Sequence, residues 1–130
     1  PQILGAGNHE YSGGEEDTDD ALSPHWPLQF AFPGNGAPGL EATTQVVDYQ
    51  GVRFIVLDGT SALNDDTLAV QTNWLRQVLA DNTAVWTVVL MHQPLFTCAR
   101  ANDPARLKTA WRSLFQAGGV DLVLQGHDHC

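Results

Sequence analysis

Basic residues are scarce in this sequence. Its 130 residues include six lysines and arginines against 15 aspartates and glutamates, which gives a formal net charge of −9 at pH 7. Nucleic acids and anionic membrane surfaces are bound mainly by clustered lysine and arginine side chains. The composition therefore argues against a nucleic-acid-binding surface and against a membrane partner. It leaves room for a phosphate ester substrate, because bound cations can supply positive charge locally.

Long apolar runs are also missing. The longest, around Trp86–Met91, is far too short to cross a bilayer. Apolar residues still make up 43% of the chain, as in ordinary globular proteins. A chain of this length buries roughly two thirds of its unfolded surface. We therefore expect one ordered domain, or part of one.

Cysteine is limited to Cys98 and Cys130. The two could pair in an oxidising compartment, but two cysteines do not make a disulfide framework. Cys98, six residues past His92, could also be a free thiol near the predicted sheet edge. The cysteines alone therefore leave the compartment open.

Two short β-branched runs in the middle of the chain predict a β-hairpin. The strands are expected at about Thr44–Tyr49 and Val52–Asp58, with a tight turn at Gln50-Gly51. The segment NDDTLAVQTNWLRQVLADN then predicts a helix, because its apolar residues recur at helical spacing. Asp65 or Asp66 can cap the start of that helix.

The last third of the chain predicts a βαβ unit. The run AVWTVVLM indicates a strand buried on both faces, and VDLVLQ indicates a short buried strand. Between them, DPARLKTAWRSLFQAGG predicts a helix with Pro104 in its first turn and Gly118-Gly119 at its end. The two strands should therefore be parallel, and ligands of such sheets bind beyond the carboxyl ends of the strands.

Four of the five histidines follow expected strand ends. A strand end at Gln2–Ala6 leads into Asn8 and His9, His92 follows the AVWTVVLM strand, and His127 and His129 follow the last strand. If these strands share a sheet, the side chains converge at its edge. Neutral imidazoles with an amide oxygen are suitable ligands for zinc or another transition metal.

His127 and His129 are two positions apart. In an extended segment this spacing points both rings to one side, where they could share a metal site. Considered without the rest of the sequence, His127 and His129 could instead be a pair of surface histidines.

A long loop, Ser12–Gly39, is rich in glycine, proline and acidic residues. Its acidic run Glu15–Asp20 is either a solvated face or, less commonly, a calcium-binding loop. His25 is assigned no role. Three aromatic residues of the loop either pack over the core or contact a nucleoside or aryl group: Trp26, Phe30 and Phe32.

Three motifs in this order resemble the calcineurin-like metallophosphoesterase family: GNHE (Gly7–Glu10), MHQP (Met91–Pro94) and GHDH (Gly126–His129). The longer stretches GNHEY, VVDYQGVRFIVLD, NWLRQVLA, WTVVLMHQPLF and DLVLQGHDH are similar to its purple-acid-phosphatase-like branch. The resemblance implies a hydrolase, a phosphatase that cleaves phosphate esters at a dinuclear metal site. It also implies an α/β fold, a β-sandwich flanked by helices in a four-layer α/β/β/α domain.

The resemblance also implies a role for each motif residue. Asn8, His92 and His127 correspond to ligands of one metal ion, and His129 corresponds to a ligand of the other. His9 corresponds to the residue that faces the phosphate and helps the leaving group depart. The implied cofactors are two divalent or trivalent transition metal ions, which could be iron, zinc or manganese.

Glu10 and Asp128 match motif positions that do not bind metal directly. They could orient the neighbouring imidazoles through hydrogen bonds. A purely structural role is the equal alternative.

Two aspartate-bearing motifs of the family, one of which supplies a carboxylate that bridges the metals, have no counterpart here. Asp58 is not a substitute, since it ends a hairpin strand and is expected to form a local turn or cap. We therefore expect residues 1–130 to be the C-terminal portion of one metallophosphoesterase catalytic domain, with the opening PQILGAG lying in the interior of a protein. Such a fragment supplies about half of the metal ligands, could hold one ion, and is expected to be weakly active or inactive alone.

Several alternatives remain open from the sequence. The substrate could be a phosphodiester or a nucleotide rather than a monoester, or the chain could be a noncatalytic metal-binding fragment. An unpaired sheet edge could also support a homo-oligomer. The resemblance favours a secreted or periplasmic location.

Overall fold

The computed structural model of the protein describes residues 2–12, 21–100 and 104–130. The acidic run Glu15–Asp20 lies outside the described residues. The strands are β1 (Gln45–Tyr49), β2 (Val52–Val56), β3 (Trp86–Leu90) and β4 (Leu122–Leu124). The α-helices are α1 (Trp26–Gln29), α2 (Asp65–Ala80) and α3 (Ala105–Ala117), and two short 3₁₀ helices are η1 (Asn8–Glu10) and η2 (Ser61–Leu63).

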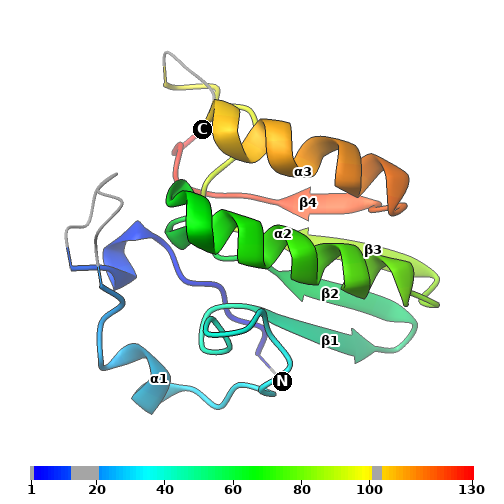
Figure 1. Cartoon of the computed structure of the whole chain (residues 1–130), viewed down its shortest axis with the longest axis horizontal. Coiled ribbons are helices and arrows are strands. Elements are labelled where there is room, and N and C mark those ends of the chain that lie inside the picture. Colours follow the sequence, from blue (N-terminus) through cyan, green and yellow to red (C-terminus); the bar gives the residue numbers. More distant parts are fainter. Residues whose placement is uncertain (1, 13–20, 101–103) are drawn as a thin grey trace.

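The strands share a mixed sheet in the order β1-β2-β3-β4 (Figure 1). β1 and β2 are antiparallel, whereas β2, β3 and β4 run parallel. The hairpin turns at Gln50 and Gly51, whose φ angles of 49° and 82° are both positive, as in the turns that suit a twisted two-residue hairpin. These pairings confirm the predicted hairpin, the βαβ unit and the α/β class.

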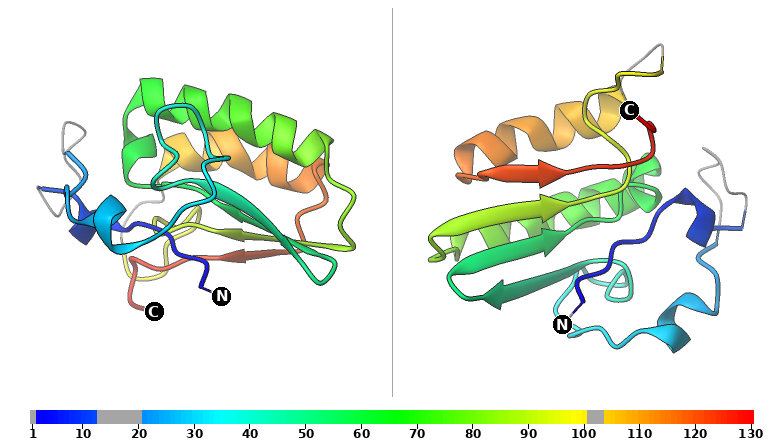
Figure 2. Two further views of the ribbon diagram at one scale, coloured as in Figure 1. Left: turned by 90° about the horizontal axis from the view of Figure 1, so that it is seen from below. Right: turned by 180° about the vertical axis from the view of Figure 1, so that it is seen from behind.

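Helices α2 and α3 cover one face of the sheet (Figure 1 and Figure 2, left). The side chains facing them alternate along the strands with those facing away, as the pleat requires. Ile55 and Val89 from this face are fully buried with Leu75 of α2 and Trp111 of α3. The main hydrophobic core therefore lies between the sheet and the two long helices.

The opposite face of the sheet is apolar, and no described helix covers it (Figure 2, right). The strand register places these residues on that face: Val47, Tyr49, Val52, Phe54, Val56, Trp86, Val88, Leu90, Leu122 and Leu124. Trp86 is 58% exposed, and Leu122 and Leu124 are 49% and 48% exposed. The prediction that the AVWTVVLM strand is buried on both faces, and that the last strand is buried, is therefore wrong for the described residues.

Two local predictions also need correction. Asn64, rather than Asp65 or Asp66, caps α2, because its side chain accepts a hydrogen bond from Asp66 N–H while Asp65 already lies in the helix. Residues 2–6 form no strand, although Gln45 Nε2 donates to the Leu4 carbonyl at 2.9 Å and anchors this segment beside the sheet. Within the described ranges, no helix has the length and apolar character needed to cross a membrane.

Candidate metal centre

Three side chains from distant parts of the sequence meet beyond the carboxyl ends of the parallel strands. Asn8 begins η1, His92 follows β3, and His127 follows β4. Asn8 Oδ1 lies 2.8 Å from His92 Nε2 and 3.3 Å from His127 Nδ1, and the two imidazole nitrogens are 3.3 Å apart. The sequence had predicted that these residues converge at one edge of the sheet, and the structure brings them together there.

His92 lies between two glycines that leave room for its ring. A Cβ placed on Gly7 would come within 2.9 Å of His92 Cγ and Nδ1, and a Cβ on Gly126 would lie 3.3 Å from Nδ1. The backbone of His92 is held as well, because its carbonyl accepts a hydrogen bond from Gly126 N–H at 3.0 Å. Any larger residue at position 7 would displace the imidazole.

Burial lowers the pKa of His92, and the charge of neighbouring His127 lowers it further. His9 and His129 act in the same direction, whereas Glu10 opposes them. The neutral form of His92 is therefore favoured, and neutral imidazole is the form that binds metal ions.

The three donor atoms fit a metal ion. An ion with bonds of about 2.0–2.1 Å holds adjacent donors roughly 2.8–3.0 Å apart in octahedral geometry and roughly 3.3–3.4 Å apart in tetrahedral geometry. The separations of 2.8, 3.3 and 3.3 Å are close to these ranges, and the donor set of one amide oxygen and two imidazole nitrogens suits zinc, iron or manganese. Without an ion, the same distances allow a hydrogen bond between His92 and Asn8.

His9 and His129 are exposed beside this cluster. The sequence had placed His127 and His129 in an extended segment, and that expectation is wrong. Both residues have positive φ angles, 66° for His127 and 53° for His129, so their rings are directed by a tight turn rather than by strand alternation. His25 is exposed beside α1.

Glu10 and Asp128 contact backbone amides rather than imidazoles. Glu10 Oε2 accepts from Gly7 N–H at 2.8 Å and so closes the turn that carries Asn8. Asp128 is buried, and hydrogen bonds from Ala99 N–H and Cys98 N–H hold the pKa of its carboxyl below the usual range. Of the two interpretations of these carboxylates, their hydrogen bonds to backbone amides favour the structural one.

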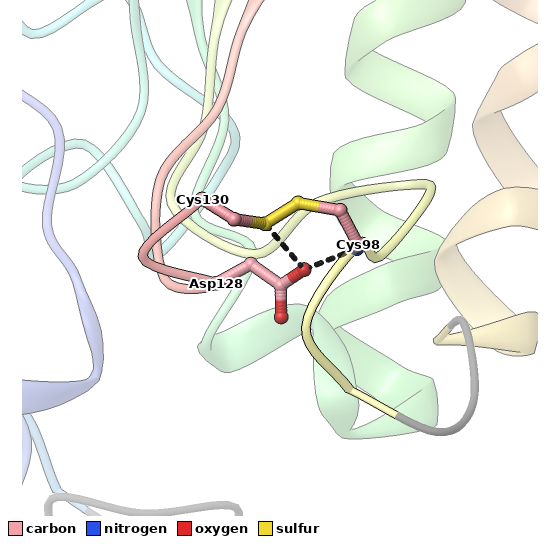
Figure 3. Close-up of side chains that lie close together, drawn as sticks. All are labelled: Cys98, Asp128 and Cys130. Carbon is pink, nitrogen blue, oxygen red and sulfur yellow. Dashed lines mark hydrogen bonds between the residues drawn. A yellow bond between two sulfur atoms is a disulfide. The ribbon is translucent and has the colours of Figure 1, made fainter.

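Cys98 and Cys130 form a disulfide, with their Cα atoms 6.3 Å apart (Figure 3). That separation lies within the usual range for disulfides. The expectation that Cys98 could be a free thiol is therefore wrong. Cys98, Cys130 and Asp128 cluster as metal ligands often do, but the two sulfurs are bonded to each other.

A second buried contact ties the GNHE segment to the end of β2. The Tyr11 hydroxyl donates to Asp58, and Asp58 Oδ1 accepts from Ser61 N–H at 3.0 Å. This contact three residues along the chain agrees with the expected local turn or cap at Asp58, although Thr60 is the residue before η2. Burial raises the pKa of Asp58. Burial and the adjacent carboxyl also raise the pKa of Tyr11.

The aromatic residues of the long loop pack on one another. The Trp26 and Phe30 ring centroids are 4.9 Å apart, and those of Phe30 and Phe32 are 6.5 Å apart. Trp26 Nε1 also donates to the Ala42 carbonyl at 2.8 Å. The three rings therefore pack on one another, and their packing over the core stays a prediction.

The whole chain has relatives among known proteins. It is 28% identical over 141 residues to an acid phosphatase of Aspergillus ficuum, an alignment that covers 99% of this chain and 22% of that protein. It is 32% identical over 146 residues to an uncharacterized protein of Mycobacterium tuberculosis strain H37Rv, covering 99% of this chain and 27% of that protein. Purple acid phosphatase 15 of Arabidopsis thaliana is 29% identical over 135 residues, with 99% of this chain and 24% of that protein covered. The chain thus spans about a quarter of the length of these relatives.

The family description "Calcineurin-like phosphoesterase" matches residues 1–130, the full extent of the sequence. The three motifs, the mixed sheet and the convergence of Asn8, His92 and His127 agree with that match. The chain therefore belongs to the calcineurin-like phosphoesterase family, and its relatives include acid and purple acid phosphatases.

Proposed function

We propose that the protein is a metal-dependent phosphatase that hydrolyses phosphate monoesters at a dinuclear centre. Asn8, His92 and His127 hold one ion, and His129 contributes to the second. The observation that carries this proposal is the meeting of three neutral donor atoms within 3.3 Å of one another, from positions 8, 92 and 127 of the chain.

Metal ions bound at such a centre activate water as a nucleophile and neutralise charge on the phosphoryl oxygens. The residues of this chain have complementary tasks. Asn8 and His92 are buried or half-buried and present their donor atoms to one point, while His9 is exposed beside them. His9 is therefore suited to donate a proton to the leaving oxygen of a bound ester.

The ions also explain how an acidic chain handles an anionic substrate. The net charge of −9 would repel a phosphate ester at long range. Bound cations reverse the sign of the local potential. Two transition metal ions drawn from iron, zinc and manganese satisfy both the donor chemistry and this requirement.

The 130 residues are the C-terminal portion of the catalytic domain in this proposal. Support comes from the apolar sheet face opposite the helices, on which Trp86 is 58% exposed. Large exposed apolar patches are covered by other parts of a protein or by partners. A second sheet, formed by a further segment of the polypeptide that also carries the missing carboxylates, is the proposed cover.

Export to an oxidising compartment is also proposed. The Cys98–Cys130 disulfide supports it, since disulfides persist mainly in secreted and periplasmic proteins. Disulfide mapping of protein taken from its native source tests this point, and a fully reduced pair would contradict it.

Three variants of the full-length protein test the proposed function. His92→Ala should lose bound metal and turnover of p-nitrophenyl phosphate together, because the cluster loses a ligand. His9→Ala should keep the metal content and lose turnover roughly 10²–10⁴-fold, the usual contribution of a general acid. His25→Ala, an exposed histidine outside the cluster, is the matched control and should behave as wild type.

The outcomes separate the candidate functions. Full turnover of His9→Ala at equal metal content would refute the proton-donor role. Preference for bis-p-nitrophenyl phosphate over p-nitrophenyl phosphate would make the enzyme a phosphodiesterase. Metal binding without turnover of either ester would make the protein a noncatalytic metal-binding protein.

A further inference from the structure

The turn that carries His127 needs support from outside its own strand. β4 ends at Leu124, and His127 and His129 both lie in the left-handed region of backbone space. Non-glycine residues in that conformation persist only where the surroundings hold them. In this turn Gly126 N–H donates to the His92 carbonyl, and Asp128 N–H donates to the Gly126 carbonyl.

Asp128 reaches from this turn to the loop that follows β3. Its Oδ2 accepts hydrogen bonds from Cys98 N–H and from Ala99 N–H, the latter at 2.9 Å. Its Oδ1 lies 3.4 Å from Arg100 Nε. Asp128 is only 7% exposed, so the two amide hydrogen bonds to its carboxylate form largely away from water, where charge-assisted bonds are stronger. The Arg100 side chain is 44% exposed, so its ion pair with Asp128 is partly solvated.

The disulfide joins the same two loops. Cys98 lies six residues after His92, and Cys130 directly follows His129. Figure 3 shows the Asp128 carboxylate beneath the Cys98–Cys130 bond, and its Oδ2 lies 3.4 Å from Cys130 Sγ. A covalent bond and a buried carboxylate therefore connect the two loops side by side.

We propose that Asp128 and the Cys98–Cys130 disulfide act together as a clamp that positions the metal-binding histidines. The clamp binds the loop after β4 to the loop after β3, and so keeps the His127 ring beside His92 and Asn8. Asp128 and the cysteines are positioning groups that touch neither ion nor substrate. The functional part of the proposal rests on the metal centre proposed above.

The clamp is not itself a metal site. Both sulfur atoms are consumed by the disulfide, and neither is a thiolate. Asp128 Oδ2 already accepts two amide hydrogen bonds, and Oδ1, which accepts no hydrogen bond within the described residues, lies 3.4 Å from the cationic Arg100 guanidinium. The geometry of the cluster is thus explained by the connection between loops.

The test compares variants of the clamp with a matched control in the protein. Asp128→Ala removes the carboxylate, Asp128→Asn keeps one acceptor oxygen, and the double change Cys98→Ser with Cys130→Ser removes the disulfide. Asp121→Ala is the control, because Asp121 Oδ2 also accepts a backbone hydrogen bond, from Thr87 N–H at 2.7 Å, but at the opposite end of β3 and β4. Two properties are measured: Zn²⁺ affinity, and the nuclear Overhauser contact between the His92 and His127 rings in metal-free protein.

The rings of His92 and His127 have centroids 5.1 Å apart, so the contact between them should be observed in wild type and in Asp121→Ala. It should be lost or weakened in Asp128→Ala and in the double cysteine variant. Zn²⁺ affinity should fall roughly 10–100-fold in these two, as it does when residues that support metal ligands are changed. Asp128→Asn should recover part of both properties.

Retention of the ring contact and of wild-type Zn²⁺ affinity in Asp128→Ala and in the double cysteine variant would overturn the clamp. An equal loss of both in Asp121→Ala would also overturn it, because general destabilisation would then be the cause. If one clamp variant fails to fold, the other and Asp128→Asn decide. A wild type that shows the ring contact but binds no metal would refute the metal centre, and the ring contact alone would still judge the clamp.

Discussion

Substitution of Gly7 by alanine adds a single methyl group at the most crowded point of the candidate centre. The added Cβ would lie 2.9 Å from both Cγ and Nδ1 of His92 and 3.1 Å from Cδ2. Carbon atoms in contact prefer separations of about 3.5–4.0 Å, so the imidazole has to move by roughly 0.6 Å or more. The ring cannot rotate away freely, because the contacted atoms include Cγ at its base.

Such a displacement exceeds what a metal site tolerates. Ligand distances in real sites lie within roughly 0.2 Å of their ideal values. Overpacking of this kind also destabilises folded proteins by about 1–3 kcal/mol. We therefore expect Gly7→Ala to unfold at lower denaturant concentration and to bind Zn²⁺ roughly 10–100-fold more weakly, although Gly7 offers no ligand atom.

Gly5→Ala is the control for this measurement. It adds the same methyl group two residues away, where the Cβ would lie 3.3 Å from Val56 Cγ1 rather than against His92. Isothermal titration with Zn²⁺ and urea denaturation of both variants separate a loss of stability from a loss of metal affinity. If Gly7→Ala and Gly5→Ala bind Zn²⁺ equally well, the inferred role of Gly7 in placing His92 is refuted.

The remaining predictions concern stability. Joint replacement of Cys98 and Cys130 by serine should lower the free energy of unfolding by roughly 3–4 kcal/mol, because the unfolded variant regains the chain entropy that the disulfide removes by closing a loop between cysteines 32 residues apart. Denaturant titration of the oxidised wild type and of the variant checks this value. Leu75→Ala should cost about 2–5 kcal/mol in the same assay, because Leu75 of α2 is fully buried in the core between the helices and the sheet. Burial raises the pKa of Asp58 above 3.8, so the native state holds this proton more tightly than the unfolded state does. The contribution of Asp58 to stability should therefore be complete below pH about 4 and should fall as pH rises through the raised pKa. Asp58→Asn should lack this fall. If the stability of wild type and variant changes with pH in the same way, the prediction is refuted.

Much of the fold follows from short-range patterns that the sequence states directly. The Gln50-Gly51 turn between two β-branched runs specifies the hairpin, and both residues adopt the positive φ angles that such a turn requires. The helix from Ala105 to Ala117 lies between Pro104 and Gly118, close to its predicted ends, although Pro104 is the residue before the helix rather than part of its first turn. Each of these features depends on residues close together in the chain, so one sequence suffices to predict it.

The cover of each sheet face was not predictable in the same way. A run such as Trp86–Leu90 is apolar on both faces, which is typical of a strand between two layers. The register nevertheless leaves Trp86, Leu122 and Leu124 about half exposed on the face without helices. The local sequence pattern indicates which side chains are apolar, but the element that covers them can come from any distance along the polypeptide.

In the candidate centre, too, some features were predictable from the sequence and others were not. The histidines were predictable because parallel strands bring their carboxyl ends to one edge, and β3 and β4 do so. The residue types in the three motifs do not indicate that Gly7 faces the His92 ring, or that Asp128 accepts amide hydrogen bonds from residues about 30 positions away. These contacts form between loops, and loop packing is not encoded in spacing.

This difference has a consequence for how the centre is built. None of its three donors lies inside a strand or a long helix, since Asn8 sits in a short 3₁₀ turn and His92 and His127 follow strand ends. The sheet brings the donors to one region, but the exact distances between the donor atoms depend on contacts between the turns themselves. The residues that make those contacts, Gly7 against His92 and Asp128 against the Cys98 loop, should therefore control metal affinity as strongly as many ligands do. A motif glycine or aspartate that does not itself bind the ion thus still affects metal affinity, because it determines whether the ligand atoms can meet.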